Sequence, residues 1–513
     1  MQQLSGLDAS MLYMETAQTP NHVAAIYTYD PSTAPGGSVS FDQIVENVRR
    51  RLGLSPTFRR KMVRVPFGLD HPYWVEDADF DLAHHVRLVT LPAPGSWRQL
   101  FDTLAELYAT PLDLRRPPWE MYVIEGLADG VDGIRHGAFA TLVKVHHAAV
   151  DGVSGMELMT VLHDREPGAE PPRVDDVWRG EPTPTSALLL QRAWINNVLK
   201  PMHAVRVAGR LAPAMVRAQV GIRQGRLQAP PGPLPQTRFN APVSPHRSID
   251  AMRAPLDDIK RLRGVVSGST VNDVALTVVG GALRRFLEAN DELPDQSLVA
   301  MVPISTRRPD QSGAGGNRIS MMTTSLATDE PDPVKRMALI SMGMQGVKEL
   351  SNAVGGHALA DLSDAMPGLL LGLGSRANSR MAARSRGRPP ANTAVTNVPG
   401  PSEPLYFTGA RVVGPYGAGP IPHGMGLIHL LGSYAGQFAF SFTADREMMP
   451  DPAFYAQCLR DSLDELSAVA PAGTRPTAAR TTERHRASTG KSTTTKRGAT
   501  RRSARRSKPR ARG

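Results

Sequence analysis

The feature that most constrains the fold is a largely apolar run that ends in two histidines. Residues 138–145 have the composition of a buried strand, and His146-His147-Ala148-Ala149-Val150-Asp151-Gly152 follows directly. Asp151 can hold a loop and Gly152 permits a sharp turn. The segment therefore predicts a tight loop that presents an imidazole at a strand end, where it can accept a proton near neutral pH.

The motif has two other interpretations. The histidines can pack at a strand end beside an ordinary Asp-Gly turn, or they can bind a metal together with the aspartate. We expect no metal, because no third histidine or carboxylate cluster lies nearby at ligand spacing. The sequence has no Gly-x-Ser-x-Gly elbow and no P-loop. We interpret the dinucleotide-like glycines at residues 372–377 as a chance match.

Length and composition indicate a globular protein of more than one domain. A chain of 513 residues exceeds one ordinary core. Cys458 is the single cysteine, which excludes an internal disulfide and a thiolate zinc site. Residues 366–373 are too short an apolar stretch to span a bilayer, and the N-terminus lacks a signal pattern. We therefore expect an intracellular protein.

The basic charge is concentrated at the C-terminus. The formal net charge is +11, but residues 471–513 hold 14 of the 59 Lys and Arg and one of the 48 acids. The first 470 residues keep 45 basic and 47 acidic residues and are close to neutral. A Ser-, Thr-, Arg- and Lys-rich segment with few large apolar residues predicts a disordered tail over residues 469–513.

Strand and helix patterns alternate in both halves of the chain, which predicts an α/β fold. We expect an N-terminal domain over residues 1–180, a basic helical and proline-rich linker over 181–245, and a C-terminal domain over 246–468. Expected helices cover residues 41–52, 97–108, 271–289 (capped by Ser269 or Thr270) and 452–466. Extended segments are expected at residues 66–75, 86–91, 298–304, 394–397 and 436–444.

The interval from residue 182 to residue 249 contains no acid but nine Lys or Arg. Within it, residues 188–226 have helical character, and Arg206, Arg210, Arg217 and Arg223 are interleaved with apolar side chains. This pattern suits an anionic membrane surface or acidic phosphates. The alternative is a long helix between domains with a solvated basic face, and the two interpretations are compatible.

Several separated segments together resemble one family. The chain is similar to bacterial wax ester synthase/acyl-CoA:diacylglycerol acyltransferases, which lie within the chloramphenicol acetyltransferase-like superfamily. The likeness covers about residues 4–468 and includes the histidine motif. Pro118 stands where the family usually has leucine. The other matching segments are Leu4-Ser5-Gly6-Leu7-Asp8-Ala9 with Glu15, Thr19-Pro20-Asn21-His22-Val23, residues 111–120, Val271-Asn272-Asp273-Val274, Val302-Pro303-Ile304-Ser305, Gly316-Asn317-Arg318, Asn397-Val398-Pro399-Gly400-Pro401, and Ser433-Tyr434-Ala435-Gly436.

The resemblance implies two coenzyme A-dependent acyltransferase domains with mixed sheets around a central tunnel. It also implies that His147 is a general base that takes a proton from an alcohol as the alcohol attacks a thioester. Asn272 is the candidate donor to the resulting oxyanion or a substrate-positioning residue. The alternative for Asn272 is a first-turn helix residue satisfied by local hydrogen bonds.

Other matching positions complete the predicted site. Asp151 pairs with a basic residue and holds the loop in similar proteins, and His146 orients its neighbour or packs. Gly152 permits the turn. The candidate substrate-lining residues are Glu15, Trp119, Asn272 and Ser433. An exposed helix acid is the alternative for Glu15, and a core residue is the alternative for Trp119.

The expected substrates are a long-chain acyl-CoA and either diacylglycerol or a fatty alcohol, with no cofactor beyond the acyl-CoA co-substrate. We expect a cytoplasmic enzyme that contacts the inner membrane face or lipid droplets peripherally. One rival is a condensation-type enzyme acting on carrier-protein thioesters, because fold does not fix function. The other is a non-enzymatic nucleic-acid-binding protein that uses residues 471–513 to bind polyanions.

Overall fold

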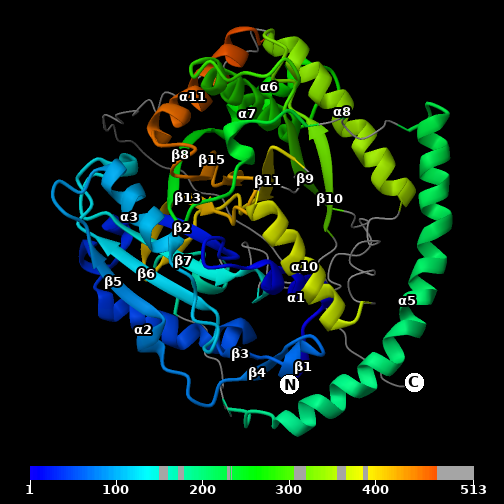
Figure 1. Cartoon of the computed structure of the whole chain (residues 1–513). Helices are drawn as coiled ribbons and strands as arrows, with labels where there is room; N and C mark the ends of the chain where they lie inside the picture. The colour runs from blue at the N-terminus through cyan, green and yellow to red at the C-terminus, as the bar shows by residue number, and fades with distance from the viewer. Residues whose placement is uncertain are drawn as a thin grey trace, which may run out of the picture. The chain divides into compact units, whose positions relative to one another are not determined.

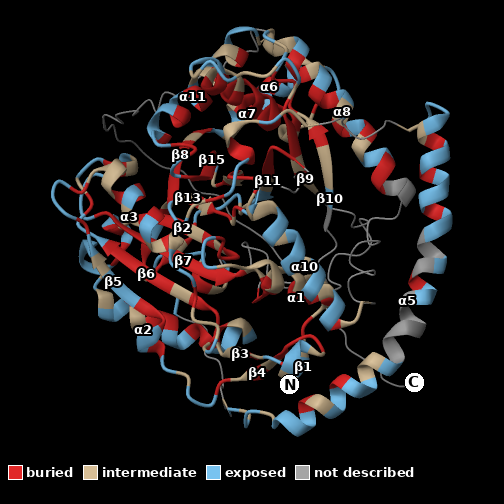
Figure 2. Cartoon of the chain, in the orientation of Figure 1, coloured by how far each residue is buried: buried red, intermediate tan, exposed pale blue. Residues whose placement is uncertain are grey.

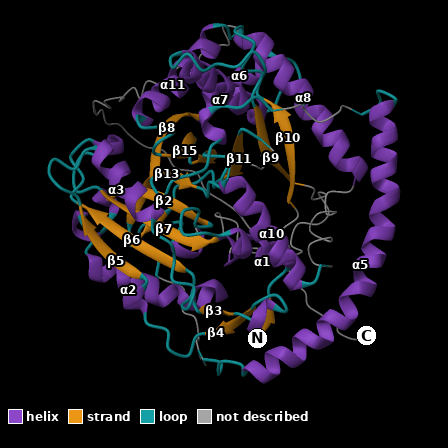
Figure 3. Ribbon diagram, viewed as in Figure 1, coloured by secondary structure: helices purple, strands orange, loops and turns teal. Residues whose placement is uncertain are grey.

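The computed structural model describes residues 1–149, 160–170, 178, 180–227, 232, 234–305, 319–354, 366–384 and 391–470. Two six-stranded sheets and one three-stranded sheet are found in these ranges, with helices packed around them (Figures 1 and 3). The predicted α/β fold with two mixed sheets is confirmed. Asp151, Gly152 and the tail from residue 471 lie outside the described residues.

The first sheet has the order β12-β13-β2-β7-β6-β5. Only β5 runs parallel to its neighbour within the described sheet, and the other pairs are antiparallel. Its strands are β2 (His22–Asp30), β5 (Val86–Thr90), β6 (Trp119–Glu125), β7 (Phe139–His146), β12 (Tyr406–Phe407) and β13 (Ala410–Ala418). All eight residues of β7 are buried, as the run of apolar residues predicted (Figure 2).

Two helices cover the two faces of this sheet. Helix α2 (Phe41–Arg51) packs on the face that carries Val123 and Val143. Helix α3 (Trp97–Ala109) packs on the opposite face, against Ile124 and Leu142. Each helix begins with a capping box, in which a serine and the glutamine three residues later satisfy each other's backbone N–H groups. Successive residues of β6 and β7 thus serve two hydrophobic cores.

The second sheet has the order β10-β9-β11-β14-β15-β8 and is also mixed. Its strands are β8 (Arg247–Pro255), β9 (Val299–Ser305), β10 (Ile319–Ser325), β11 (Thr393–Pro399), β14 (Leu427–Tyr434) and β15 (Gln437–Asp445). Its associated helices are α6 (Leu256–Leu262), α7 (Val271–Glu288), α8 (Pro333–Val354) and α11 (Pro452–Ala468). Helix α7 is almost wholly buried in this core, and its N-cap is Thr270 rather than Ser269.

One segment from the second half of the chain is exchanged into the first sheet. Strands β12 and β13 lie between residues 246 and 468, yet they extend the sheet formed by the N-terminal half. Strand β13 pairs with β2 over nearly the whole length of both, from Arg411 opposite Asp30 to Ala418 opposite Ala24. Division of the sequence at residues 180 and 246 does not anticipate this exchange. Residues 1–471 form one compact unit by their contacts.

Smaller elements surround the histidine loop. The three-stranded sheet has the order β1-β4-β3, made of β1 (Gln2–Gln3), β3 (Arg60–Val63) and β4 (Tyr73–Glu76). Helix α1 (Gly6–Met14) lies beside α10 (Gly368–Ala383), which comes from the second half of the chain (Figure 1). Because residues 372–377 are inside α10, they do not form the loop that a dinucleotide site requires.

One expectation for this region is wrong in part. Residues 66–75 are not one extended segment, because Pro66–Gly68 forms a 3-10 turn and the strand begins only at Tyr73. The long helix predicted over residues 188–226 is present as α5 (Ser186–Arg223). It contacts α8 and the turn at Pro66–Gly68. Leu189 and Ala193 are buried against Val65 and Tyr73, which anchors its first part.

Candidate active site

His147 lies immediately after β7, at the start of a 3-10 turn that covers His147–Ala149. Its backbone N–H donates to the Asn21 carbonyl at 2.9 Å, and the Thr57 hydroxyl donates to the Ala149 carbonyl at 3.3 Å. Ala148 is fully buried against Leu4, Ala9, Leu12 and Met62. The turn is therefore fixed on both sides, and His147 as a whole residue is half-buried.

His146 points inward and is fully buried. Its Nδ1 accepts a hydrogen bond from the Ala148 N–H at 3.1 Å, so the ring proton of the neutral form is on Nε2. That nitrogen faces Glu15 Oε2 at 3.6 Å, which is longer than a direct hydrogen bond. His146 thus stabilises the turn from within the core, and His147 is the less buried residue of the pair.

Burial is the main cause that lowers the pKa of His147 below its ordinary value of 6.5, and the neighbouring His146 lowers this pKa further. Desolvation disfavours the charged imidazolium, and so does a second imidazole close by. At neutral pH His147 is therefore neutral. A neutral imidazole has the lone pair that a general base needs.

Glu15 braces the loop that faces the turn. It follows α1, and its Oε1 accepts the Asn21 backbone N–H at 3.1 Å. The Asn21 side chain donates to the Met11 carbonyl at 2.7 Å, and the Asn21 carbonyl holds His147. These bonds tie α1 to the histidine turn. Contact between Glu15 and a substrate stays a prediction.

Arg247 was not identified from the sequence as a residue of this region. It begins β8 in the second sheet and is 4% exposed, and its guanidinium donates to the carbonyl of Gln18 in the loop between Glu15 and Asn21. It also donates to the carbonyls of Ser244 and His246. The loop that holds His147 is therefore linked to the second sheet. The sequence signal for Arg247 is weak, since this arginine is only the last basic residue of the acid-free interval 182–249.

Lys144 is a second residue whose role the sequence analysis missed. It lies within β7 and is fully buried. Its Nζ donates to the carbonyls of Leu107 and Thr110 at 3.0 and 2.7 Å and reaches Glu120 Oε2 at 3.3 Å. Burial lowers the pKa of Lys144, and Glu120 opposes that effect. The pair joins β6, β7 and the end of α3 two residues before His146.

Trp119 lies in the core. It is 1% exposed, and its indole N–H donates to the Phe58 carbonyl at 2.9 Å. Its ring stacks on His85 with centroids 4.6 Å apart. Because its one polar atom is satisfied and its surface is covered, this geometry favours the core interpretation of Trp119 over a ligand contact.

Asn272 is the second residue of α7 and is half-buried. The helix cap is provided by Thr270 and Asp273, which satisfy each other's backbone N–H groups. Within the described residues the Asn272 side chain makes no hydrogen bond, so its amide is not used by the helix end. This favours the donor interpretation of Asn272 over local satisfaction.

Ser433 lies near the end of β14, opposite Pro399 of β11, and is half-buried. Its carbonyl accepts the Gly400 N–H at 2.7 Å, and a Cβ built on Gly400 would lie 2.2 Å from that oxygen. Only glycine fits such an approach, so this contact explains the glycine of the Asn-Val-Pro-Gly-Pro segment. Among the described residues, no hydrogen bond or ion pair joins Ser433 or Asn272 to the histidine turn.

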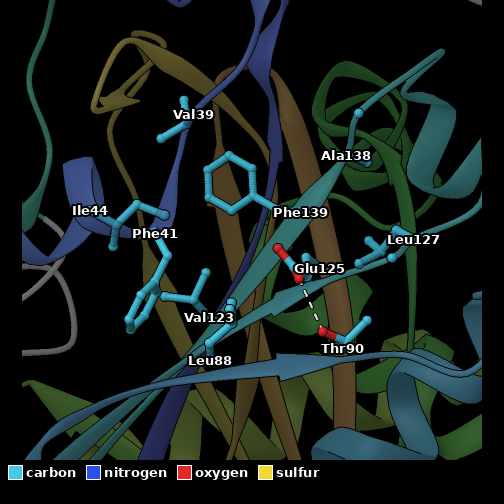
Figure 4. Close-up of a pocket in the computed structure, with 12 residues that line it drawn as sticks. Val39, Phe41, Ile44, Leu88, Thr90, Val123, Glu125, Leu127, Ala138 and Phe139 are labelled. Atoms are coloured by element: carbon cyan, nitrogen blue, oxygen red, sulfur yellow. Dashed lines mark hydrogen bonds between the residues drawn. The ribbon is translucent and has the colours of Figure 1, made fainter.

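A pocket of about 350 Å³ lies between the start of α2 and the strands β5 and β6 (Figure 4). Its lining is mainly apolar, and within it the Thr90 hydroxyl donates to Glu125 Oε1 at 3.0 Å. Phe139 borders it at the first residue of β7, whereas His146 is the last. At about 3.3 Å per residue the pocket is roughly 20 Å from the histidine turn, so it is separate from the candidate site.

Solved structures establish the class of fold. The first condensation domain of the calcium-dependent antibiotic synthetase, in complex with a substrate analogue, has a TM-score of 0.51 at 14% identity. The match covers 91% of this chain and 96% of that one. This likeness shows a shared two-sheet fold. The wax ester synthase/diacylglycerol acyltransferase from Marinobacter aquaeolei VT8 has a TM-score of 0.64 at 26% identity and covers 92% of this chain and 100% of its own.

Sequence comparison narrows the class to a family. Residues 4–275 match the model of the wax ester synthase/diacylglycerol acyltransferase catalytic domain, and residues 315–467 match the C-terminal domain model of the same family. Two Mycobacterium tuberculosis proteins named after diacylglycerol O-acyltransferase activity are 33% and 35% identical over 467 and 468 residues. These matches cover 91% and 90% of this chain and 90% and 99% of the relatives. The chain belongs to the wax ester synthase/diacylglycerol acyltransferase family and is an acyltransferase.

Proposed function

We propose that this protein transfers a long-chain acyl group from acyl-CoA to the hydroxyl of diacylglycerol or of a fatty alcohol. The observation that carries the proposal is the position of His147, a half-buried residue on a turn at the end of β7 that the Asn21 carbonyl holds in place. Burial lowers the pKa of this imidazole, which suits a general base. The activities that name the relatives and the M. aquaeolei structure supply the substrate class. No cofactor beyond the acyl-CoA co-substrate is part of the proposal.

The chemistry needs one general base and one hydrogen-bond donor to the oxyanion. His147 takes the hydroxyl proton as the alcohol oxygen attacks the thioester carbonyl, and the imidazolium returns that proton to the CoA thiolate as the C–S bond breaks. The tetrahedral intermediate has a negative oxygen that a preorganised donor stabilises. Asn272 is the proposed donor, because its amide is unused within the described residues. No acyl-enzyme forms in this sequence of steps.

The test offers the purified protein palmitoyl-CoA with dipalmitoylglycerol, with hexadecanol or with no acceptor. Free CoA is measured together with the lipid product. We expect CoA release that depends on an acceptor and equals the triacylglycerol or wax ester formed. CoA release that does not depend on an acceptor, or the absence of any lipid product, would contradict the proposal. A carrier-protein thioester offered with an amine tests the condensation-type rival, which at 14% identity has support from the fold alone.

We further propose that α5 helps to hold the enzyme on an anionic membrane or droplet surface on the cytoplasmic side. No helix in the described part of the chain is both long and apolar enough to cross a membrane. Helix α5 has no acidic residue, and Arg206, Arg217 and Arg223 are exposed on it beside Val205 and Val216. Basic and apolar side chains on one surface suit anionic lipid headgroups. The side chain of Arg210 lies outside the described residues.

Replacing Arg206, Arg217 and Arg223 together with glutamine is expected to weaken binding to anionic vesicles about tenfold or more. Each basic side chain near such a surface contributes about 1 kcal/mol. Cosedimentation with phosphatidylglycerol vesicles at low and high salt measures the effect. A matched triple change of Arg49, Arg50 and Arg261, which are exposed and ion-paired, should leave binding nearly unchanged. If wild type and the α5 variant bind the vesicles equally, α5 is only a helix between domains with a solvated basic face.

Residues 471–513 are proposed as an accessory that binds polyanions, through the charge of 14 Lys and Arg against one acid. Deletion of these residues distinguishes an accessory from the main activity. If the tail is an accessory, deletion lowers binding to nucleic acid or anionic lipid and leaves acyl transfer to a water-soluble acceptor unchanged. Loss of that transfer would instead make the tail part of the enzyme.

A further inference from the structure

Phe67 has a combination of features that packing does not explain. It lies in the turn Pro66–Gly68 with φ of 59°, a left-handed conformation that is unfavourable for a bulky L-residue. Its side chain is 85% exposed, the highest value among the exposed large apolar residues described. The strained conformation is thus not offset by burial of the ring. Strain that local packing does not offset is a reason to look for a function.

Helix α10 begins beside this turn and adds an exposed apolar stripe. A Cβ on Gly368, its first residue, would lie 2.9 Å from the His71 backbone nitrogen, so the helix start abuts the chain just after the turn. Leu370 and Leu373 are 56% and 54% exposed, and their i, i+3 spacing places them on one face. Leu369 at the helix start is also exposed. We call Phe67, Leu369, Leu370 and Leu373 the Phe67–α10 surface.

The charges on helix α10 itself have one sign. Helix α10 contains no acidic residue, and its Arg376 and Arg380 are exposed one turn and two turns after Leu373. Apolar side chains next to arginines on an acid-free helix match the boundary between lipid headgroups and acyl chains.

The same helix leads to the catalytic base. On its inner side, Gly372 faces the Tyr13 ring of α1. The exposed Arg376 lies at the edge of this contact, with its guanidinium 5.9 Å from the centroid of the Tyr13 ring. Tyr13 packs with the cluster that buries Ala148, the residue after His147. Two side-chain layers therefore connect the Phe67–α10 surface to the histidine turn.

We propose that the Phe67–α10 surface inserts into an anionic phospholipid surface and is the point at which the lipid acceptor leaves the bilayer for the enzyme. The proposal rests on the proposed function, since it names where that reaction obtains its acceptor. It is distinct from the electrostatic role of α5, because its main contribution is apolar insertion. The strained turn holds the aromatic ring outward, ready for the lipid phase.

Phe67→Asn tests the proposal with little risk to the fold. Asparagine tolerates the left-handed conformation better than phenylalanine does, and the lost side chain was exposed. The variant should therefore keep or slightly raise the melting temperature. Binding to vesicles of phosphatidylcholine and phosphatidylglycerol should fall about tenfold, the loss expected for one buried aromatic side chain. Turnover of palmitoyl-CoA with dioleoylglycerol embedded in those vesicles should fall by a similar factor.

Turnover with a water-soluble short-chain alcohol serves as the internal reference and should not change in Phe67→Asn. If neither acceptor is turned over by the wild type, the proposed function fails, whatever the variant does. If the wild type is active and Phe67→Asn loses both activities equally, or its melting temperature falls, Phe67 is structural and the surface proposal is wrong.

Leu373→Gln provides a second, helical variant, and Leu339→Gln on α8 is its control, because Leu339 is 47% exposed on a helix that has no part in the surface. Only Leu373→Gln should lower vesicle binding. Sedimentation without lipid tests the other occupant, a second copy of this chain. A dimer in the wild type that becomes a monomer in Phe67→Asn and Leu373→Gln would overturn the lipid assignment.

Discussion

His147→Ala is expected to lower acyl transfer by about 10²- to 10⁴-fold while the protein stays folded. This range is the usual contribution of a positioned general acid or base. The ring is half-buried and sits outside the main cores, so its removal leaves a small gap at the surface of the turn. The backbone N–H of residue 147 still bonds to Asn21 in the variant. Circular dichroism, the melting temperature and initial rates with a saturating acceptor are the measurements.

The matched control is His136→Ala. His136 is exposed, and among the described residues its one ion pair is with the exposed Asp129 at 2.8 Å, so its loss should leave the rate within about twofold. A folded His147→Ala protein with near-normal turnover would exclude the base role. A loss of the same size in the His136 variant would show that the assay reports something other than the base.

The pH profile gives an independent readout of the same residue. Burial and His146 lower the pKa of His147 below 6.5, so the base is neutral at pH 7 and becomes protonated as the pH falls through that lowered value. The acid limb of kcat/KM should therefore have its midpoint below pH 6.5 and should vanish from the residual activity of His147→Ala. A midpoint above 6.5 would contradict a desolvated base.

The sequence predicted most of what is local. Helix α2 and helix α7 begin within one residue of the expected positions, because capping residues and an apolar period mark them. The buried strand before the histidines was equally clear from its composition. The sequence does not predict the Pro66–Gly68 turn, because apolar residues with prolines and a glycine are also typical of extended chain. A phenylalanine at positive φ has no sequence signal at all.

Contacts between distant parts of the chain could not be predicted from the sequence. Strand β13 pairs with β2 across almost 400 residues, and neither strand's composition specifies its partner. In the sequence Arg247 belongs to a basic interval, but in the structure it is buried against a loop near the N-terminus. The motif identified His147 because its chemistry is concentrated in a few adjacent residues. The residues that hold His147 in place come from separate segments, so they required the structure.

Asp132→Ala is expected to destabilise the fold by about 2–4 kcal/mol, because one buried carboxylate holds the junction of the two sheets. Asp132 lies in the turn between β6 and β7, and its side chain is 4% exposed. It accepts hydrogen bonds from Thr28 of β2, from Tyr416 of β13 at 2.8 Å, and from Arg253 of β8 in the second sheet. Arg253 also donates to the Val413 carbonyl at 2.8 Å.

Removal of this carboxylate takes one acceptor from each of three donors, although Arg253 keeps its hydrogen bonds to the Val413 and Asp132 carbonyls. Burial, and to a lesser degree Asp132 itself, raises the pKa of Tyr416 well above its ordinary value, so that hydroxyl remains a donor in need of a partner. The Arg253 side chain keeps partial access to water, which reduces the cost below that of a fully buried ion pair. The turn has φ of 54° at Asp132, a conformation that alanine tolerates less well than aspartate.

Two further variants separate these causes. Asp132→Asn keeps the backbone preference and one acceptor oxygen but removes the charge, so its loss of stability should lie between those of wild type and Asp132→Ala. Asp129→Ala, three residues earlier in the same turn region, removes only an exposed pair with His136 and should change the free energy of unfolding by no more than about 0.5 kcal/mol. Urea unfolding of all three proteins gives the comparison. Since the carboxylate joins β2, β8 and β13, Asp132→Ala should also lower the cooperativity with which the two sheets unfold. If its unfolding curve instead matches that of the Asp129 variant, strand pairing alone holds the junction.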